Sequence, residues 1–185
     1  RTPGSPGMGV VRVKEGEDAV NKEKHSEYRS GVGMLLFLLK HSRPDICNAV
    51  RELTKGLTGP SPAAYKEMLR VIKHVLDTDT LGLKLCPVKS NDLKWKLVLY
   101  TDSDWAGDKD DRRSVSGFIL FLNEAPIMWR SKSQKTVALS SAEAEFVAAA
   151  EAVREIKFVV QVLHFLEVSG TRWSQFWTRI PEQWT

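Results

Sequence analysis

The hydrophobic period of this chain changes near residue 80, and that change limits the fold more than any other feature. Before it, apolar residues recur every three or four positions, the spacing of helices that bury one face. After it, apolar and polar residues alternate, as at Leu97, Leu99 and Thr101, which is the spacing of strands with one buried side. Because helices come first and strands follow, the sequence predicts an α+β fold.

Three helices are expected before the change of period. The first covers residues 28–39, and the second begins around residues 42–45, with Ser42 as its cap and Pro44 in its first turn. The third runs from residue 61 to residue 76, and its apolar face packs on the other two helices or, alternatively, forms a groove for a partner. The expected buried positions are Ile46, Val50, Leu53, Leu57, Tyr65, Met68, Leu69, Ile72, Val75 and Leu76.

Strands and one long helix are expected after the change of period. Alternation predicts strands at residues 81–85, 97–102, 117–122 and 127–130, the last two joined by a turn. Ser140 and Glu143 form a capping-box pattern, which opens a helix that runs to about Glu167. No regular element is expected beyond Gly170. The expected inner face of the long helix consists of Phe146, Ala149, Val153, Ile156 and Val160.

Composition excludes several classes of protein. With 42% hydrophobic and 27% charged residues among 185, the chain can build a core, and its longest apolar run is far short of the roughly 20 residues that span a membrane. Cys47 and Cys86 make no disulfide framework, so an intracellular location is expected rather than secretion. The chain starts at Arg1 without a signal-peptide pattern, as expected for a piece of a longer protein. The net charge of +4 suits an anionic partner, but also a surface of solvated lysines.

Acidic residues in two segments are candidate metal ligands. Asp102 stands at the end of an apolar strand, where a carboxylate can hold a hard divalent cation, whereas Asp108, Asp110 and Asp111 are expected in a solvated loop. Acids in the first turns of the long helix are favoured by the helix dipole whatever their function. The two acids there are Glu143 and Glu145. Glu145 adjoins the apolar stripe and is expected nearer the sheet, whereas Glu143 fits the capping role.

At these residues the chain resembles the ribonuclease H-like domain at the end of copia-type retrotransposon Pol polyproteins. The matching motifs are Tyr-Thr-Asp-Ser-Asp-Trp-Ala-Gly at 100–107, Asp-Asp-Arg-Arg-Ser-Val-Ser-Gly-Phe at 110–118, Trp-Arg-Ser-Lys-Ser-Gln at 129–134 and Val-Ala-Leu-Ser-Ser-Ala-Glu-Ala-Glu-Phe at 137–146. Upstream, residues 28–33 and 43–46 are similar to the closing segment of the same family's reverse transcriptase. The resemblance covers roughly residues 28–168.

The resemblance implies a mixed sheet with a central helix, and an acidic cluster whose two Mg2+ ions serve hydrolysis of the RNA strand of an RNA–DNA hybrid. By motif position, Asp102 matches the first-strand aspartate and Glu145 the helix glutamate, both as catalytic residues and as metal ligands. Candidates for phosphate contacts are Arg112, Arg113, Arg130, Lys132 and Lys135, although a single surface cation is ordinarily just solvated.

The resemblance also divides the chain and names its partners. It implies a helical reverse-transcriptase tail or connection at 26–85, a partial ribonuclease H-like domain at 86–168 and a divergent tail at 169–185. Residues 1–25 hold Gly, Pro and charges with little apolar periodicity and are expected to form a flexible lead-in. The expected partners are an RNA–DNA hybrid or another nucleic acid and the rest of the Pol polyprotein, with no membrane.

The match fails where the family places its later carboxylates, on a strand after the helix and beyond. No aspartate follows Asp111, and two carboxylates do not neutralise two divalent ions. The sequence therefore predicts an incomplete ribonuclease H-like sheet, a three-stranded meander with one long helix, and little or no nuclease activity. Two hypotheses compete with this transposon fragment: a non-catalytic remnant that binds nucleic acid, and a decayed pseudogene product.

Overall fold

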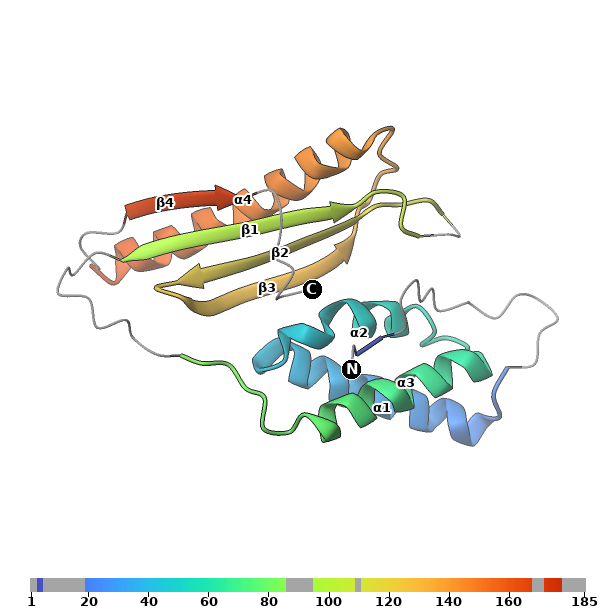
Figure 1. The fold of residues 1–185 in the computed structure, drawn as a ribbon. Coiled ribbons are helices and arrows are strands. Elements are labelled where there is room, and N and C mark those ends of the chain that lie inside the picture. Colours follow the sequence, from blue (N-terminus) through green and yellow to red (C-terminus); the bar gives the residue numbers. More distant parts are fainter. Residues whose placement is uncertain (1–2, 5–18, 86–94, 109–110, 168–171, 178–185) are drawn as a thin grey trace. The chain divides into compact units, whose positions relative to one another are not determined.

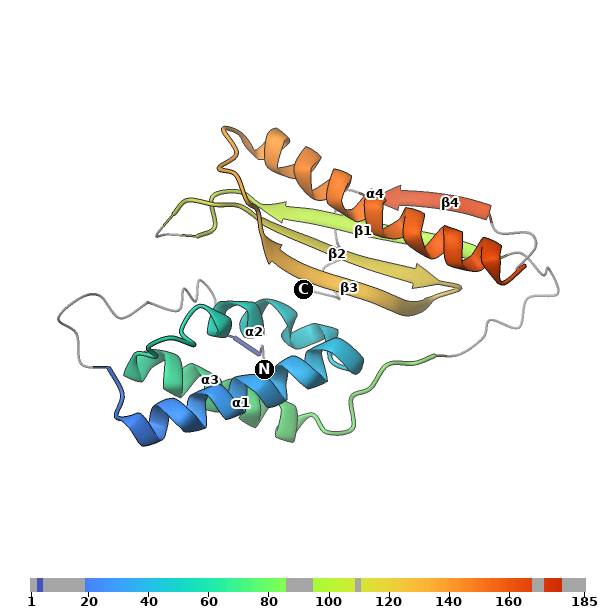
Figure 2. The ribbon, with the colours of Figure 1, turned by 180° about the vertical axis from the view of Figure 1, so that it is seen from behind.

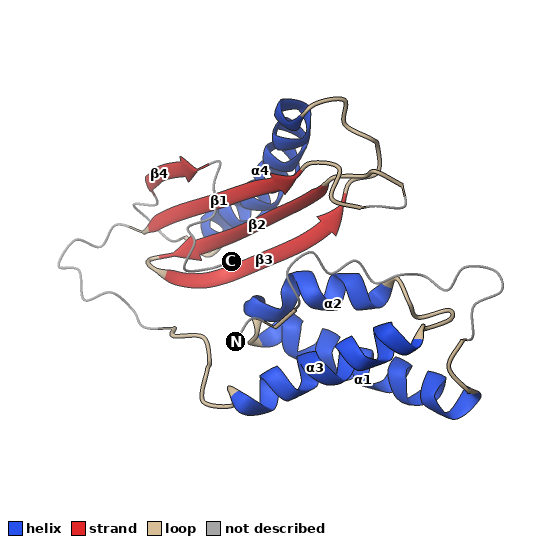
Figure 3. Ribbon diagram, turned by 45° about the vertical axis from the view of Figure 1, so that its right-hand side comes forward, coloured by secondary structure: helices blue, strands red, loops and turns tan. Residues whose placement is uncertain are grey.

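The chain folds into two compact units, Arg1–Gly82 and Leu83–Thr185. The structure is a computed structural model that describes residues 3–4, 19–85, 95–108, 111–167 and 172–177 (Figure 1). Most of the expected lead-in, as well as Asp110, Cys86 and the end of the expected tail, lies outside the described residues. Helices make up the described elements of the first unit, whereas the second combines strands with one helix (Figure 3). The α+β fold class is thereby confirmed.

The first unit contains helices separated by short turns. Asn21 caps the first helix through its side-chain oxygen, which accepts a hydrogen bond of 2.9 Å from the Lys24 N–H, so this helix begins earlier than expected. Ser42 does not cap the second helix, and that prediction is wrong: its backbone N–H bonds to Leu38 O and closes the first helix instead. The elements are α1 (Lys22–His41), the 3-10 turn η1 (Pro44–Ile46), α2 (Cys47–Thr54) and α3 (Pro62–Asp77).

The core of the first unit lies between α1, α2 and α3. Gly31 permits close packing there, because a Cβ at this position would stand 2.5 Å from Met68 Sδ. The Tyr28 hydroxyl donates a hydrogen bond of 2.6 Å to Leu53 O, and burial raises the pKa of Tyr28 to about 12. Leu69 and Leu76 were expected in this core but are exposed, because the buried stripe of α3 is narrower than the sequence pattern. The buried core consists of Tyr28, Val32, Leu35, Ile46, Ala49, Val50, Leu53, Ala64, Met68 and Val71.

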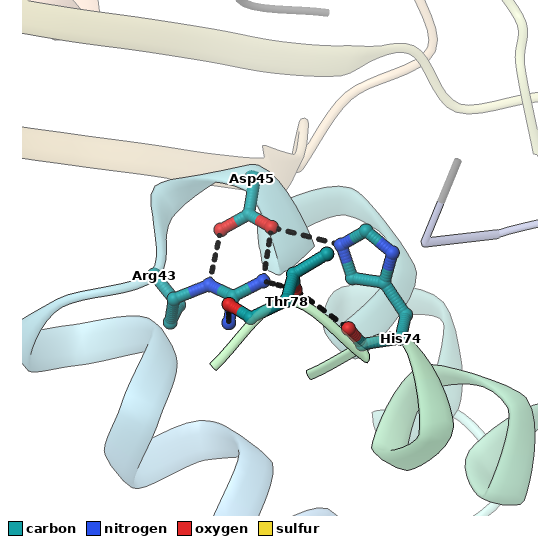
Figure 4. A network of polar contacts seen from close by, with 4 residues as sticks. All are labelled: Arg43, Asp45, His74 and Thr78. Carbon is teal, nitrogen blue, oxygen red and sulfur yellow. Dashed lines mark hydrogen bonds and ion pairs between the residues drawn. The ribbon is translucent and has the colours of Figure 1, made fainter. Parts of the chain in front are cut away.

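A partly buried network around the Arg43–Asp45 ion pair connects the turn before α2 to the end of α3 (Figure 4). The Arg43 guanidinium binds both carboxylate oxygens of Asp45, at 2.9 and 2.8 Å, and also donates to Thr78 O and Thr78 Oγ1. The Nε2 atom of His74 lies 3.1 Å from Asp45 Oδ2. Burial by itself would raise the pKa of Asp45, but the hydrogen bonds from Arg43 and His74 outweigh burial and hold that pKa below its ordinary value.

The second unit is a four-stranded sheet in the order β3-β2-β1-β4. Its middle strands pair antiparallel, with Asp102 opposite Gly117, and β1 pairs parallel with β4, with Tyr100 opposite Trp177. Asn123 and Glu124 form the two-residue turn of the β2–β3 hairpin, both at positive φ, as tight hairpins require. The elements are β1 (Lys96–Asp104), β2 (Val115–Leu122), β3 (Ala125–Ser133), α4 (Ser141–Phe165) and β4 (Arg172–Trp177).

Two expectations about strands are wrong. Residues 81–85 form no strand despite their alternation, because among the described residues no strand pairs with them. Conversely, β4 forms beyond Gly170, where no regular element was expected. Its pairing depends on the neighbouring β1, a contact distant in the sequence that no local period reports. The edge of β1 is consequently covered by β4, so the sheet extends beyond the predicted three-stranded meander.

Helix α4 covers one face of this sheet and is in front of it in Figure 2. Its inner face differs from the prediction, since Phe146 is 75% exposed and small alanines lie in its place. Alanine lets the helix approach β1 and β2 closely, whereas a phenyl ring would hold it away. The buried residues of α4 are Ala144, Ala148, Ala152, Ile156, Val159 and Leu163, and they pack on Leu97, Leu99, Phe118 and Leu120.

Candidate metal and nucleic-acid site

Asp102 lies near the end of β1, and its carboxylate is half-buried. The backbone N–H of Ser103 donates a hydrogen bond of 2.9 Å to Oδ1, which fixes the orientation of the carboxylate. Within the described part of the chain no hydrogen bond or ion pair engages Oδ2. The arrangement thus leaves one oriented oxygen available to a cation.

Glu145 lies near the start of α4, and its side chain is exposed. Successive residues of a helix turn by about 100°, which puts Glu145 within about 40° of the centre of the buried stripe of α4. Glu143 points elsewhere and takes part in the cap: its N–H donates to Ser140 Oγ at 3.2 Å, and its carboxylate accepts from the N–H of Leu139, one residue before the cap, at 2.7 Å. The capping prediction is confirmed.

A chain of polar contacts joins the surroundings of the two candidate ligands. Ser103, next to Asp102, pairs with Ser116 of β2. The Gln134 side-chain amide donates to Ser116 Oγ at 3.0 Å and to Ala144 O at 2.9 Å. Ala144 directly precedes Glu145. Figures 1 and 2 agree that α4 begins at the end of the sheet where β1 terminates, so the structure brings both candidates to the same end of the unit.

The two candidates approach this end from different layers. The side chains of Leu97 and Leu99 pack against α4, and strand alternation therefore assigns Asp102, together with Tyr100, to the opposite face of the sheet. Asp102 and Glu145 can consequently meet only past the end of β1, around its edge.

The donor set decides what kind of ion this end of the sheet could hold. Among the described residues, no group of three or more His, Cys, Asp or Glu side chains could hold a metal ion. Two carboxylates suit a single Mg2+, which keeps several waters and uses few protein oxygens. Two carboxylates are too few for a two-ion centre, so the described residues could serve at most one such ion.

The loop after β1 is held by its own side chains. The Trp105 indole N–H donates a hydrogen bond of 3.1 Å to Ala138 O, which ties this loop to the segment before α4. The Ala106 N–H donates to Ser114 Oγ at 3.1 Å. Asp108 was expected to be solvated but is buried, because its backbone closes hydrogen bonds with residues 112 and 113 at the base of the loop. Much of the Asp-Trp-Ala-Gly motif thus shapes the loop.

The candidate phosphate-binding cations differ in their surroundings. Arg130 is engaged within the unit, since its guanidinium lies 2.6 Å from Glu155 of α4 and over the Phe118 ring. Arg113 lies 3.4 Å from Asp111 in a partly exposed ion pair. All five candidate cations are exposed, and those without an ion pair among the described residues are Arg112, Lys132 and Lys135.

Gln134 belongs to one of the motifs of the resemblance, and the sequence predicted no role for it, although it is only 1% exposed at the junction of β2, β3 and α4. Its position between the strand predicted at 127–130 and the helix cap predicted at Ser140 could have suggested a joint between the two elements. A polar side chain followed by Lys and Thr gives no periodic signal of burial, so the sequence pattern did not reveal it.

The relatives found by comparison with known proteins include an effector protein and transposon Pol polyproteins. The chain is 41% identical over 132 residues to "Secreted RxLR effector protein 161" of Plasmopara viticola, covering 71% of this chain and 90% of that protein. It is 38% identical over 147 residues to the "Retrovirus-related Pol polyprotein from transposon RE1" of Arabidopsis thaliana, covering 80% of this chain. It is also 35% identical over 139 residues to the corresponding polyprotein from transposon TNT 1-94 of Nicotiana tabacum, covering 75% of this chain.

The chain spans 10% of the length of each of these two polyproteins. No protein-family model matches the chain, and no solved structure matches it. In the part of the chain that the structure describes, no helix is both long enough and apolar enough to cross a lipid bilayer.

Proposed function

The chain belongs to the family of retrovirus-related Pol polyproteins from copia-type transposons, and on that premise we propose that its second unit is a ribonuclease H-like domain. The family reaction we assign to it is metal-dependent hydrolysis of the RNA strand of an RNA–DNA hybrid. The observation that carries the proposal is that Asp102 and Glu145, from different elements, lie at one end of the sheet.

In this proposal Asp102 and Glu145 hold one Mg2+ through carboxylate oxygens. Magnesium, when bound, supplies a Lewis acid for a phosphate oxygen and lowers the pKa of a bound water. Asp102 contributes an oxygen whose orientation the Ser103 N–H already fixes. The exposed cations Arg112, Lys132 and Lys135 orient the nucleic-acid backbone by contacts to phosphates, which position the strand without reading its sequence.

We propose further that this chain binds the hybrid but cleaves it weakly or not at all. The resemblance places a third carboxylate on the strand that follows the helix. Strand β4 has that place in the chain order, yet its residues, Arg-Trp-Ser-Gln-Phe-Trp, include no acid. Two carboxylates support one ion, and among the described residues no further ligands are available for the second ion that would stabilise the leaving oxygen.

The proposal is tested with an RNA–DNA hybrid, measuring binding and cleavage with Mg2+ and after chelation. We expect that Mg2+ strengthens binding, that Asp102→Asn and Glu145→Gln each abolish this increase, and that cleavage stays near the background. Asp111→Asn is the matched control, because it removes a loop carboxylate that pairs with Arg113. If Mg2+ does not change the affinity for the hybrid, the metal site is refuted. If the chain cleaves the hybrid rapidly and Asp102→Asn abolishes this cleavage, the proposal that cleavage is weak or absent is refuted.

A second candidate function is a non-catalytic module that binds nucleic acid without a metal. The absence of a three-ligand group among the described residues favours it. It predicts hybrid binding that weakens steeply with salt, because phosphate contacts release counterions, and that is unchanged by Mg2+ or by Asp102→Asn. The pseudogene hypothesis loses one of its arguments, since β4 covers the edge of β1 that was expected to be left open.

The same proposal includes the rest of the Pol polyprotein as a partner of this chain, and an intracellular location. The effector from Plasmopara viticola is named as a secreted protein, so a secreted role is the competing proposal. Cell fractionation with an antibody against this chain separates the two: signal in the cell extract supports the first, and signal only in the medium refutes it.

A further inference from the structure

Gln134 holds together the two layers from which the candidate metal ligands come. It follows β3 directly, and its backbone N–H continues the ladder with a hydrogen bond of 2.8 Å to Ser114 O. Its side chain crosses to the helix layer and binds Ala144 O at 2.9 Å, while the same nitrogen binds Ser116 Oγ at 3.0 Å. One buried amide thus connects the sheet to the first turn of α4.

The orientation of this amide is fixed by its partners. The carbonyl of Ala144 can only accept a hydrogen bond, so the side-chain nitrogen must face it and not the oxygen. The two hydrogens of the Gln134 NH2 group therefore bind Ser116 Oγ and Ala144 O, and together these two bonds fix the orientation of the amide. A shorter side chain could not span the two layers, and an apolar one could not bind the carbonyl.

We infer that Gln134 is a positioning residue, one that sets the place of Glu145 relative to Asp102. The inference rests on the proposed function. Ala144 precedes Glu145 and Ser116 pairs with the neighbour of Asp102, so each bond of the amide ends one residue from a candidate ligand or its strand partner. Because Asp102 and Glu145 come from opposite layers, a small slide of α4 along the sheet changes the gap between their carboxylates.

A purely structural role gives a different expectation. The core between α4 and the sheet already includes four apolar residues of the strands and the buried stripe of the helix, and it holds the helix on the sheet without Gln134. Apolar packing is non-directional and fixes the sliding position of a helix less sharply than a hydrogen bond to its first turn. Removing the amide should therefore weaken metal binding more than it weakens folding.

The test uses Tb3+ as a hard-cation probe, with luminescence sensitised by the tryptophans of the second unit, and follows urea unfolding in parallel. Gln134→Met keeps the length of the side chain but removes the donor. We expect it to lower Tb3+ affinity by about tenfold, as loss of a residue that orients metal ligands commonly does. Ala152→Gly is the matched control, because it destabilises α4 from within the core without touching the amide contacts.

Equal loss of Tb3+ affinity in Gln134→Met and Ala152→Gly, at equal loss of stability, would overturn the inference. The double variant Gln134→Met with Ser116→Ala should bind Tb3+ as Gln134→Met alone does, since both changes break one link. If the losses of Tb3+ affinity caused by Gln134→Met and Ser116→Ala add up in the double variant, the inference is also overturned. If the methionine variant does not fold, Gln134→Asn retains an amide that is too short to reach Ala144 and is expected to give the same result.

The two proposals fail in different ways. A wild-type chain that binds no Tb3+, or whose binding survives Asp102→Asn, refutes the metal site and with it this role of Gln134. Wild-type binding that depends on Asp102 but not on Gln134 refutes the positioning role alone.

Discussion

Replacing Asp45 by Asn should destabilise the first unit while leaving the second unit unaffected. The change keeps the shape of the side chain but removes its charge, and one of its two oxygens becomes an NH2 group that faces the Arg43 guanidinium. Arg43 is then left buried with a donor opposite a donor. Its remaining partners, Thr78 O and Thr78 Oγ1, are neutral.

The magnitude follows from how far each partner is exposed. Breaking a fully buried ion pair costs about 3–5 kcal/mol, whereas an exposed pair contributes about 0–1 kcal/mol. The side chain of Arg43 is 6% exposed and that of Asp45 is 36% exposed, so the pair lies between these limits. We expect Asp45→Asn to lower the free energy of unfolding of the first unit by about 2 kcal/mol.

The control is Asp77→Asn. Asp77 lies 3.8 Å from Lys73 in an ion pair whose side chains are 46% and 67% exposed, and we expect a change below about 0.5 kcal/mol. Amide hydrogen exchange in α1–α3 measures the first unit, and tryptophan fluorescence measures the second, because every tryptophan of the chain lies beyond residue 90. Equal effects of the two variants would show that burial does not strengthen the Arg43–Asp45 pair.

The same pair predicts a pH dependence. The pKa of Asp45 in the folded chain lies below its ordinary value, so the stabilisation is complete above about pH 4 and is lost as the pH falls through the folded-state pKa. In Asp45→Asn this part of the acid loss should disappear. An unchanged acid slope in the variant would mean that other carboxylates carry the dependence.

Two further predictions concern single hydrogen bonds. Tyr28→Phe removes the hydrogen bond to Leu53 O and should lower the free energy of unfolding of the first unit by about 1–2 kcal/mol at neutral pH. Because burial raises the pKa of Tyr28 to about 12, the stability of the wild-type chain should also fall as the pH rises above about 10. In urea unfolding at alkaline pH, the variant should lack the part of this fall that comes from Tyr28. Ser140→Ala removes the cap of α4 and should lower the stability of the second unit by about 1 kcal/mol in tryptophan-monitored urea unfolding, whereas Ser141→Ala, one residue later, should change it little.

The sequence predicted correctly those elements that depend on neighbouring residues in the chain. The helix start at residue 61, the cap at Ser140 and the alternating β1 follow from neighbouring residues, and each is present in the structure. The prediction failed where an element depends on pairing with a segment far away in the sequence. Residues 81–85 alternate but have no partner strand among the described residues, and β4 shows no period but pairs with β1. A strand exists only where another strand supplies hydrogen bonds, and period alone does not report this.

The inner face of α4 shows how size can override hydrophobicity. The prediction placed Phe146 against the sheet as the first residue of the expected apolar stripe of the long helix. In the structure, Ala144 and Ala148 lie there, and the phenyl ring is exposed. The polar anchor explains the choice: Gln134 can reach the carbonyl of Ala144 only if the first turns of α4 lie close to the sheet. A large side chain on this face would open that gap.

The same closeness gives the candidate site its geometry. Asp102 belongs to the face of the sheet away from α4, so no amount of packing within the core brings it toward Glu145. The pair can meet only where β1 ends and the loop held by Trp105 begins, and there the separation depends on how far α4 projects past the strand. In the positioning role proposed for it, Gln134 sets that projection through its hydrogen bond to Ala144. On that proposal, the two acids depend on a neutral residue between the helix and the sheet, and the hydrogen bonds of Gln134 connect the motif that contains it to the motif before Glu145 and to β2 beside Asp102.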